Sequence, residues 1–267
     1  MMFRISWQMY LRALTVTALV TLAAPSALAN EPAPSACQPF ADAARLEYVL
    51  AHTSRRLAHR EPLKIVAIGS SSTAGAGASS PAASYPNRLE AELKERFPNQ
   101  TIIVLNRGAN GERAKDMIAR FAQDVVAEKP DLVVWQVGSN SVLRDDPIAP
   151  ASGLIREGVA ILKSAGADVI LMNPQFAPKI IVKHNINGMV DLIDIAAKES
   201  NVAVFRRFSI MRHWRETKNM PFDAFLSPDE LHMNDWSYAC VAKLLAGSIA
   251  EAATRPAAAA SAAPGAR

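Results

Sequence analysis

An aspartate and a histidine stand three residues apart near the carboxyl end of the chain, in the segment SPDELHMND. At this spacing Asp229 and His232 can lie side by side within one turn. A carboxylate in that place fixes the imidazole tautomer and stabilises the ring when it takes a proton. The pair therefore predicts a general base that activates a nucleophile. The alternative is an exposed aspartate and a histidine that caps the next helix, because Asn234-Asp235 is itself typical of a helix start.

Hydroxyl groups crowd a second segment, GSSSTAGAG, which begins at Gly69 and contains the three consecutive serines Ser70, Ser71 and Ser72. The segment lacks the Lys-Ser/Thr pair of a phosphate-binding loop, and its glycines do not match the dinucleotide fingerprint. A serine beside a histidine base is a nucleophile for acyl transfer. A Ser/Gly-rich loop without chemistry is the alternative, and the segment alone favours it.

Two further segments offer hydrogen-bond donors for a developing negative charge. NRGANGER contains Gly108 and Gly111, where the lack of a side chain lets a backbone N–H approach a ligand closely. GSNS offers the uncharged amide of Asn140. An ordinary turn is the alternative for both segments. Taken together, the four segments supply a hydroxyl, a base with its orienting acid, and two oxyanion donors.

The elements that must position these residues follow from the apolar pattern. Five continuous apolar runs rich in β-branched residues predict buried strands, and the stretches between them repeat apolar residues at helical spacing. This alternation predicts an α/β fold, a three-layer α/β/α sandwich around a five-stranded, mainly parallel sheet. Ligands bind beyond the carboxyl ends of such strands, so the segments above should meet at one edge. The predicted strands are 63–69, 101–106, 131–138, 167–173 and 201–205.

The four segments, in this order, resemble the sequence blocks of the SGNH hydrolases, the GDSL-like esterases and lipases. AIGSSSTAG resembles the first block, NRGANG the glycine block, VGSN the Gly-x-Asn block and DELH the Asp-x-x-His block. The resemblance covers residues 69–232, which is nearly the whole predicted core. It implies a flavodoxin-like SGNH hydrolase fold and carboxylic ester hydrolysis.

The resemblance also assigns a role to each matching residue. Ser71 matches the nucleophile, His232 the base and Asp229 the acid that orients it. The backbone N–H groups of Ser71 and Gly111 and the side chain of Asn140 match the three donors of the oxyanion hole. No cofactor and no metal ion is implied.

Two positions depart from the family pattern. Ser70 stands where the family has an aspartate before the nucleophile, and Ser141 follows Asn140 where an aspartate is common. Neither residue belongs to the reacting set, so we expect activity to survive.

The amino-terminal segment predicts export. Arg4 and Arg12, a short apolar run over 13–24 and the Ala-Leu-Ala cleavage pattern at 27–29 are typical of a secretory signal peptide over residues 1–29. An uncleaved membrane anchor is the alternative, but the run is shorter than the roughly 20 residues that span a bilayer. We therefore expect a periplasmic or secreted protein without membrane insertion.

Domain boundaries follow from the two ends of the chain. The hydrolase domain is expected over 30–253, and residues 254–267 (TRPAAAASAAPGAR) predict a disordered Ala/Pro-rich tail because two prolines interrupt any helix. The whole chain has 29 basic and 25 acidic residues. This modest charge gives no electrostatic reason for nucleic acid as a partner.

The chain has two cysteines, Cys37 and Cys240, too few for an all-cysteine zinc site. Export, an even count and an amino-terminal segment that would otherwise fray predict a disulfide between them. Two unrelated thiols are the alternative.

The sequence thus predicts an exported serine esterase that hydrolyses short-chain acyl esters of a small molecule or glycan through an acyl-enzyme. The alternative is an O-acyltransferase acting on extracytoplasmic polysaccharide, or a non-catalytic binder of it.

Overall fold

The computed structural model describes Cys37 and residues 44–255 of the chain. Its centre is a five-stranded sheet in which every neighbouring pair is parallel and the strand order is β2-β1-β3-β4-β5. The predicted α/β fold and its five strands are confirmed. The strands are β1 (Leu63–Gly69), β2 (Ile102–Gly108), β3 (Leu132–Gln136), β4 (Asp168–Met172) and β5 (Ala203–Phe205).

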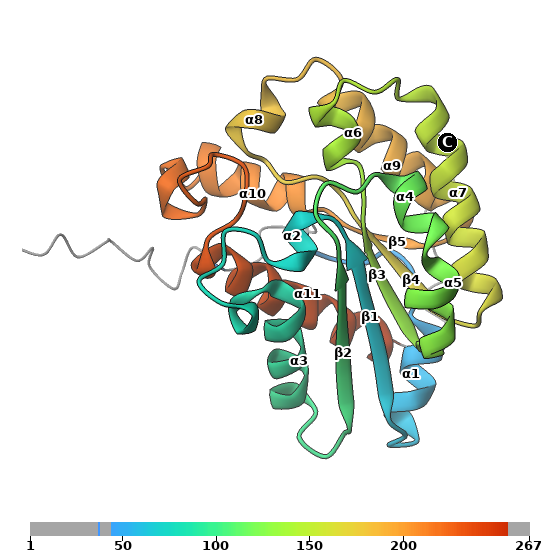
Figure 1. Ribbon diagram of the computed structural model, residues 1–267. Helices are drawn as coiled ribbons and strands as arrows, with labels where there is room; N and C mark the ends of the chain where they lie inside the picture. The colour runs from blue at the N-terminus through green and yellow to red at the C-terminus, as the bar shows by residue number, and fades with distance from the viewer. Residues whose placement is uncertain (1–36, 38–43, 256–267) are drawn as a thin grey trace, which may run out of the picture. The chain divides into compact units, whose positions relative to one another are not determined.

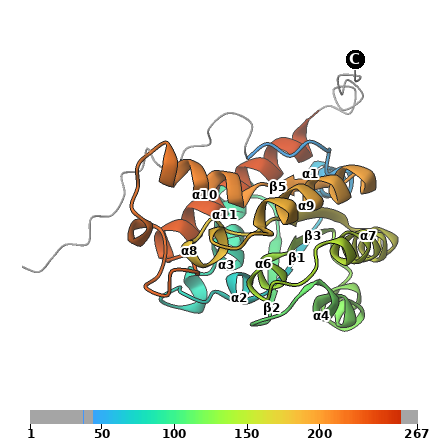
Figure 2. The same ribbon diagram turned by 90° about the horizontal axis from the view of Figure 1, so that it is seen from above.

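Helices cover both faces of the sheet (Figures 1 and 2). Helices α3 and α11 pack together on one face, whereas α4, α7 and α9 form a contiguous layer on the other. The long helices are α3 (Tyr85–Arg96), α7 (Ala149–Ser164), α9 (Ile186–Ser200), α10 (Arg207–Glu216) and α11 (Asp235–Thr254). The shorter ones are α1 (Ala51–Ala58), α2 (Ser71–Ala74), α4 (Ala114–Ala119), α5 (Phe121–Asp124), α6 (Ser139–Leu143) and α8 (Pro178–Ile181), with 3₁₀ turns at Pro81–Ala83, Val126–Glu128 and Phe222–Ala224.

The core between the sheet and α7 is closely packed. Trp135 on β3 is completely buried, and its ring lies edge-on against Phe121. A Cβ atom at Gly158 of α7 would lie 2.4 Å from the Trp135 ring, so only glycine lets this helix approach the indole.

The helical pattern around Phe121 is broken in the structure. Met117, Phe121 and Val125 recur at i, i+4 and i+8, a spacing typical of one helix, but α4 ends at Ala119 and α5 begins at Phe121. Between them Arg120 turns inward, where its guanidinium donates to the carbonyl of Arg107 at 2.7 Å and pairs with Glu112. Arg120 thus ties the end of β2 to the following loop.

A disulfide and several hydrogen bonds join the last helix and the residue after it to the amino-terminal segment. Cys37 and Cys240 form a disulfide that closes a loop of 203 residues, with 5.4 Å between their Cα atoms. Helix α11 runs to Thr254, and Arg255 donates to the carbonyl of Leu46 at 2.8 Å. The described residues therefore include the first two of the predicted tail, Thr254 and Arg255. Residues 256–267 and the predicted signal peptide, residues 1–29, lie outside the described residues. In the described part of the chain no helix is long and apolar enough to cross a membrane.

Candidate active site

The site lies at the carboxyl ends of β1 and β3. These strands are neighbours in the sheet, and the chain leaves them in opposite directions, to β2 from one and to β4 from the other. Ligands bind at such a switch point in open α/β sheets. Ser71 begins α2 directly after β1, and Asn140 lies on α6 directly after β3. The short helix α2 packs tightly on β2, since a Cβ atom at Gly108 would lie 2.1 Å from the backbone nitrogen of Ala74.

A continuous line of hydrogen bonds joins three of the predicted site residues. The Oγ atom of Ser71 lies 2.7 Å from Nε2 of His232, and Nδ1 of the same ring lies 2.5 Å from Oδ2 of Asp229. The imidazole is mostly buried, with 14% of its side chain exposed, whereas Asp229 is 43% exposed at the rim. The geometry matches a hydroxyl, a base that accepts its proton, and a carboxylate that fixes the base.

The Asp229 carboxylate is held by several donors. Oδ1 accepts hydrogen bonds from the hydroxyl of Ser227 and from the backbone N–H groups of Leu231 and His232, at 2.7, 3.0 and 2.9 Å. Burial alone would raise the pKa of Asp229, but these donors and the His232 ring together hold the pKa well below its ordinary value. The carboxylate is therefore ionised at neutral pH.

The loop that carries Asp229 and His232 has a defined backbone. An isolated antiparallel bridge joins Leu226 to Met233, and the Ser227 N–H donates to the His232 carbonyl at 2.8 Å. Glu230 adopts a left-handed conformation with φ +56°, which closes the turn between the two site residues. The three-residue spacing thus places a carboxylate beside an imidazole in a tight turn. Asn234, not His232, caps the next helix, since its side chain accepts from the Ser237 N–H.

A hydrogen bond holds Asn140 beside the loop that contains Gly111. Nδ2 of Asn140 donates to the carbonyl of Glu112, the residue after Gly111, at 2.9 Å. This leaves the second amide proton of Asn140 available. Gly111 has φ +76°, a conformation that favours glycine, and its carbonyl accepts from Arg144 at 2.9 Å. Within the described part of the chain, neither the Gly111 N–H nor the Ser71 N–H donates to a protein acceptor. All three predicted oxyanion donors therefore retain a proton to offer.

The three consecutive serines have different surroundings. Ser70 and Ser72 are 2% and 1% exposed, and the Ser70 hydroxyl donates to Oε1 of Gln136 at 3.0 Å. Of the three hydroxyls, that of Ser71 is the one hydrogen-bonded to His232.

Sequence reasoning missed a set of buried polar residues beneath the site. They lie at or just beyond the ends of β3, β4 and β5, and all are at most 3% exposed. Their signal in the sequence was a polar residue closing an otherwise apolar run, as in VVWQVGS and ILMNPQ. These residues are Gln136, Ser139, Asn173, Gln175 and Arg207.

Two tryptophans and a histidine, residue types common in active sites, are structural or lie at the surface in this chain. Trp214 is 1% exposed and packs edge-on against Trp236 with ring centroids 5.0 Å apart, so helix packing explains both rings. The His184 side chain is 83% exposed and lies 4.0 Å from Asp145. Among the described residues, no three His, Cys, Asp or Glu side chains gather in a way that could hold a metal ion.

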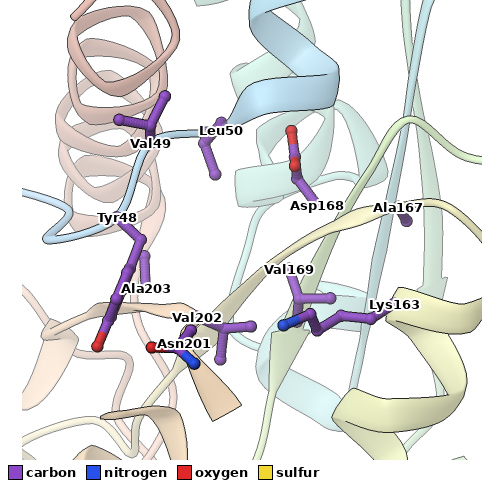
Figure 3. Close-up of a pocket in the computed structure, with 10 residues that line it drawn as sticks. All are labelled: Tyr48, Val49, Leu50, Lys163, Ala167, Asp168, Val169, Asn201, Val202 and Ala203. Carbon is purple, nitrogen blue, oxygen red and sulfur yellow. The ribbon is translucent and has the colours of Figure 1, made fainter. Parts of the chain in front are cut away.

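A small cavity of about 60 Å³ lies away from this edge, at the amino ends of β4 and β5 (Figure 3). The two charged side chains that line it are bound within the protein. Asp168 accepts from the hydroxyl of Thr53 at 2.8 Å, and Lys163 donates to the carbonyl of Ser200 at 2.9 Å. The cavity therefore offers no converging groups for chemistry.

Comparison with known proteins fits this geometry. The model of the Non-GDSL lipase-like family matches residues 36–255. The chain belongs to this family. The resemblance to SGNH hydrolases is thereby confirmed, and the relatives of the chain are carboxylic ester hydrolases.

An arylesterase of Vibrio mimicus is 28% identical over 95 residues, which are 36% of this chain and 46% of that protein. An acetylxylan esterase of Geobacillus stearothermophilus is 40% identical over 52 residues, 20% of this chain and 24% of that protein. The matched stretches thus span less than half of either relative. A crystal structure of a two-domain esterase active on acetylated mannans superposes with a TM-score of 0.68 at 20% identity, covering 80% of this chain and 56% of that one. This last likeness shows the fold.

Proposed function

We propose that the protein is a serine esterase that removes short acyl groups, acetyl above all, from a glycan or small alcohol. The observation that carries the proposal is the unbroken hydrogen-bonded line from Asp229 through His232 to Ser71. A carboxylate, an imidazole and a hydroxyl in this order generate a nucleophile at neutral pH.

The reaction proceeds in two halves. Nε2 of His232 takes the proton of Ser71 as Oγ attacks the ester carbonyl carbon, and Asp229 stabilises the imidazolium that forms. The oxyanion accepts hydrogen bonds from the Ser71 and Gly111 N–H groups and the amide of Asn140. His232 then gives its proton to the alkoxide, so the alcohol leaves and an acyl-serine remains. A water molecule, deprotonated by His232, then attacks the acyl carbon. As the bond to Oγ breaks, His232 returns this proton to Ser71 and the acid is released.

The substrate class rests on the relatives. The acetylxylan esterase and the mannan-active esterase act on acetylated glycans, according to their names. We carry this class over to the present chain, with acetyl as the acyl group.

We also propose export. A disulfide persists in an oxidising compartment, and Cys37–Cys240 supports that location. Cleavage of the predicted signal peptide would give a mature chain that begins near Asn30. Amino-terminal sequencing of the protein recovered from a bacterial periplasm tests this.

Hydrolysis of nitrophenyl esters from acetate to palmitate tests the activity, together with acetate release from acetylated xylan and mannan. We expect the highest kcat/KM for acetate and a loss on the order of 10⁴-fold or more in Ser71→Ala. Acetate release in the absence of an added sugar acceptor separates hydrolysis from acyl transfer. Wild-type activity in Ser71→Ala, or fluorophosphonate labelling of Ser70 or Ser72 instead, would contradict the proposed mechanism.

A further inference from the structure

A chain of buried hydrogen bonds runs beneath the site from the nucleophile turn to the histidine loop. The Ser70 N–H donates to Oε1 of Gln136 at 2.9 Å, and Nε2 of Gln136 donates to the Ser139 hydroxyl at 3.4 Å. That hydroxyl donates to Oε1 of Gln175 at 2.8 Å, and Nε2 of Gln175 donates to the carbonyl of Leu231 at 3.3 Å. The path thus links the residue after β1, the end of β3, the start of α6, the segment after β4 and the histidine loop.

The direction of every bond in this path is fixed by groups that can only donate. At one end the backbone N–H of Ser70 requires an oxygen, which orients the amide of Gln136. At the other end the guanidinium of Arg207 donates to Oε1 of Gln175 at 3.0 Å. Arginine has no acceptor, so the Gln175 atom that faces it must be the oxygen, and the NH₂ group must face Leu231. Ser139 then has one arrangement that satisfies both neighbours.

The Leu231–His232 peptide is consequently held on both of its polar sides. Its N–H donates to Asp229 at 2.9 Å, and its carbonyl accepts from Gln175. The His232 side chain is attached directly next to this peptide unit. The orientation of the peptide plane therefore determines where Nε2 lies relative to the Ser71 hydroxyl. Loss of the Gln175 donor would free one side of it.

Arg207 suits the role of a fixed reference. It is fully buried at the start of α10 and donates to the carbonyl of Asn173 at 3.2 Å as well as to Gln175. No carboxylate of the described residues forms an ion pair with it. Burying a cation without a counter-ion is costly, and the hydrogen bonds to Asn173 and Gln175 offset part of this cost.

Resting on the proposed function, we propose that Gln175 is a positioning residue for His232, with Arg207 setting the orientation of its amide. Gln175→Glu separates this role from stability. A carboxylate of the same shape keeps both acceptor contacts, to Arg207 and Ser139, and gives Arg207 a counter-ion. It has no N–H for the Leu231 carbonyl and places an oxygen against it.

In Gln175→Glu we expect kcat to fall about tenfold or more, KM to change by less than about twofold, and Tm not to fall. We also expect the proton NMR signal of the imidazole Nδ1–H, bound to Asp229, to shift or broaden. The matched control is Gln123→Glu, which makes the same exchange at an exposed position of α5 and should alter neither kcat nor the signal.

The proton signal decides the inference independently of turnover. An unshifted signal in Gln175→Glu overturns the proposal, whatever happens to kcat. Should that variant fail to fold, Ser139→Ala cuts the same path with a smaller change and is judged by the same signal. Wild-type hydrolysis in Ser71→Ala would instead overturn the proposed function. The proton signals of Gln175→Glu and Gln123→Glu could still be compared, and they would show whether Gln175 positions His232.

Discussion

Replacing Asp229 by asparagine tests the proposed mechanism most sharply, because the exchange keeps shape and removes one contact. The amide oxygen can still accept from Ser227, Leu231 and the His232 backbone, as Oδ1 of the carboxylate does now. The amide nitrogen would then face Nδ1 of His232, where Oδ2 now lies at 2.5 Å. A donor there forces the ring into the tautomer that carries its proton on Nε2, which can no longer accept the proton of Ser71.

The exchange should therefore lower kcat by far more than it lowers the stability of the fold. A histidine held in the wrong tautomer costs about 10⁴-fold in kcat, or about 5.4 kcal/mol of transition-state stabilisation. The free energy of unfolding should fall by only about 1 kcal/mol, because three acceptor bonds remain and solvent screens the partly exposed carboxylate.

Steady-state hydrolysis of nitrophenyl acetate measures the first quantity, and urea unfolding the second. Asp191→Asn on α9, an exposed exchange outside the hydrogen-bonded line, is the matched control and should leave both unchanged. A loss in kcat below about tenfold in Asp229→Asn would refute the role of the carboxylate in fixing the histidine tautomer.

The other predictions concern neighbouring serines, metal ions, the disulfide and acid stability. Ser70→Ala and Ser72→Ala should each cost less than about tenfold in kcat, since neither hydroxyl contacts the histidine; a loss equal to that of the nucleophile variant would contradict this. Exhaustive EDTA treatment should leave full activity, because no three potential ligands gather in the described part of the chain, and recovery by added zinc or calcium would refute it. Thiol titration of the unfolded, unreduced mature protein should find no free thiol from Cys37 or Cys240, and reduction should cost at most about 5 kcal/mol of unfolding free energy in the chain-entropy model. Folding lowers the pKa of Asp229, so its carboxylate should stabilise the protein at pH values above the unfolded pKa of about 3.9. This stabilisation should be lost as the pH falls through the lower pKa of the folded protein. A difference in stability between the wild type and Asp229→Asn that persists in strong acid would contradict this.

The fold was predictable because burial on both faces leaves a plain mark in the sequence. The run 63–69 coincides with β1, and the run 131–138 contains β3, whose residues are all buried. Short helices left no such mark. Helices α2 and α6 have four and five residues, too few for a periodic apolar face, and they follow the strands that carry the site.

The site was predictable where chemistry restricts the residue type. Few side chains other than histidine act as a base at neutral pH, so DELH was readable. The path through Gln136 and Gln175 was not, because many polar side chains can satisfy a buried donor and only three-dimensional contact reveals which one does. The sequence shows a glutamine at the end of a strand, and the structure shows which donors meet its oxygen.

The departure of Ser70 from the family pattern has a physical reason in the same path. Oε1 of Gln136 accepts from the Ser70 N–H, from the Ser70 hydroxyl and from Thr73, at 2.9, 3.0 and 3.3 Å. A carboxylate at position 70 would set acceptor against acceptor, and relief by rotating the Gln136 amide would deprive the Ser70 N–H of its oxygen. A serine at position 70 is therefore compatible with a glutamine at the end of β3, because its neutral hydroxyl donates a hydrogen bond where an aspartate could only accept one. In this chain the buried amide of Gln136 thus holds the turn before Ser71 through the N–H and the hydroxyl of Ser70.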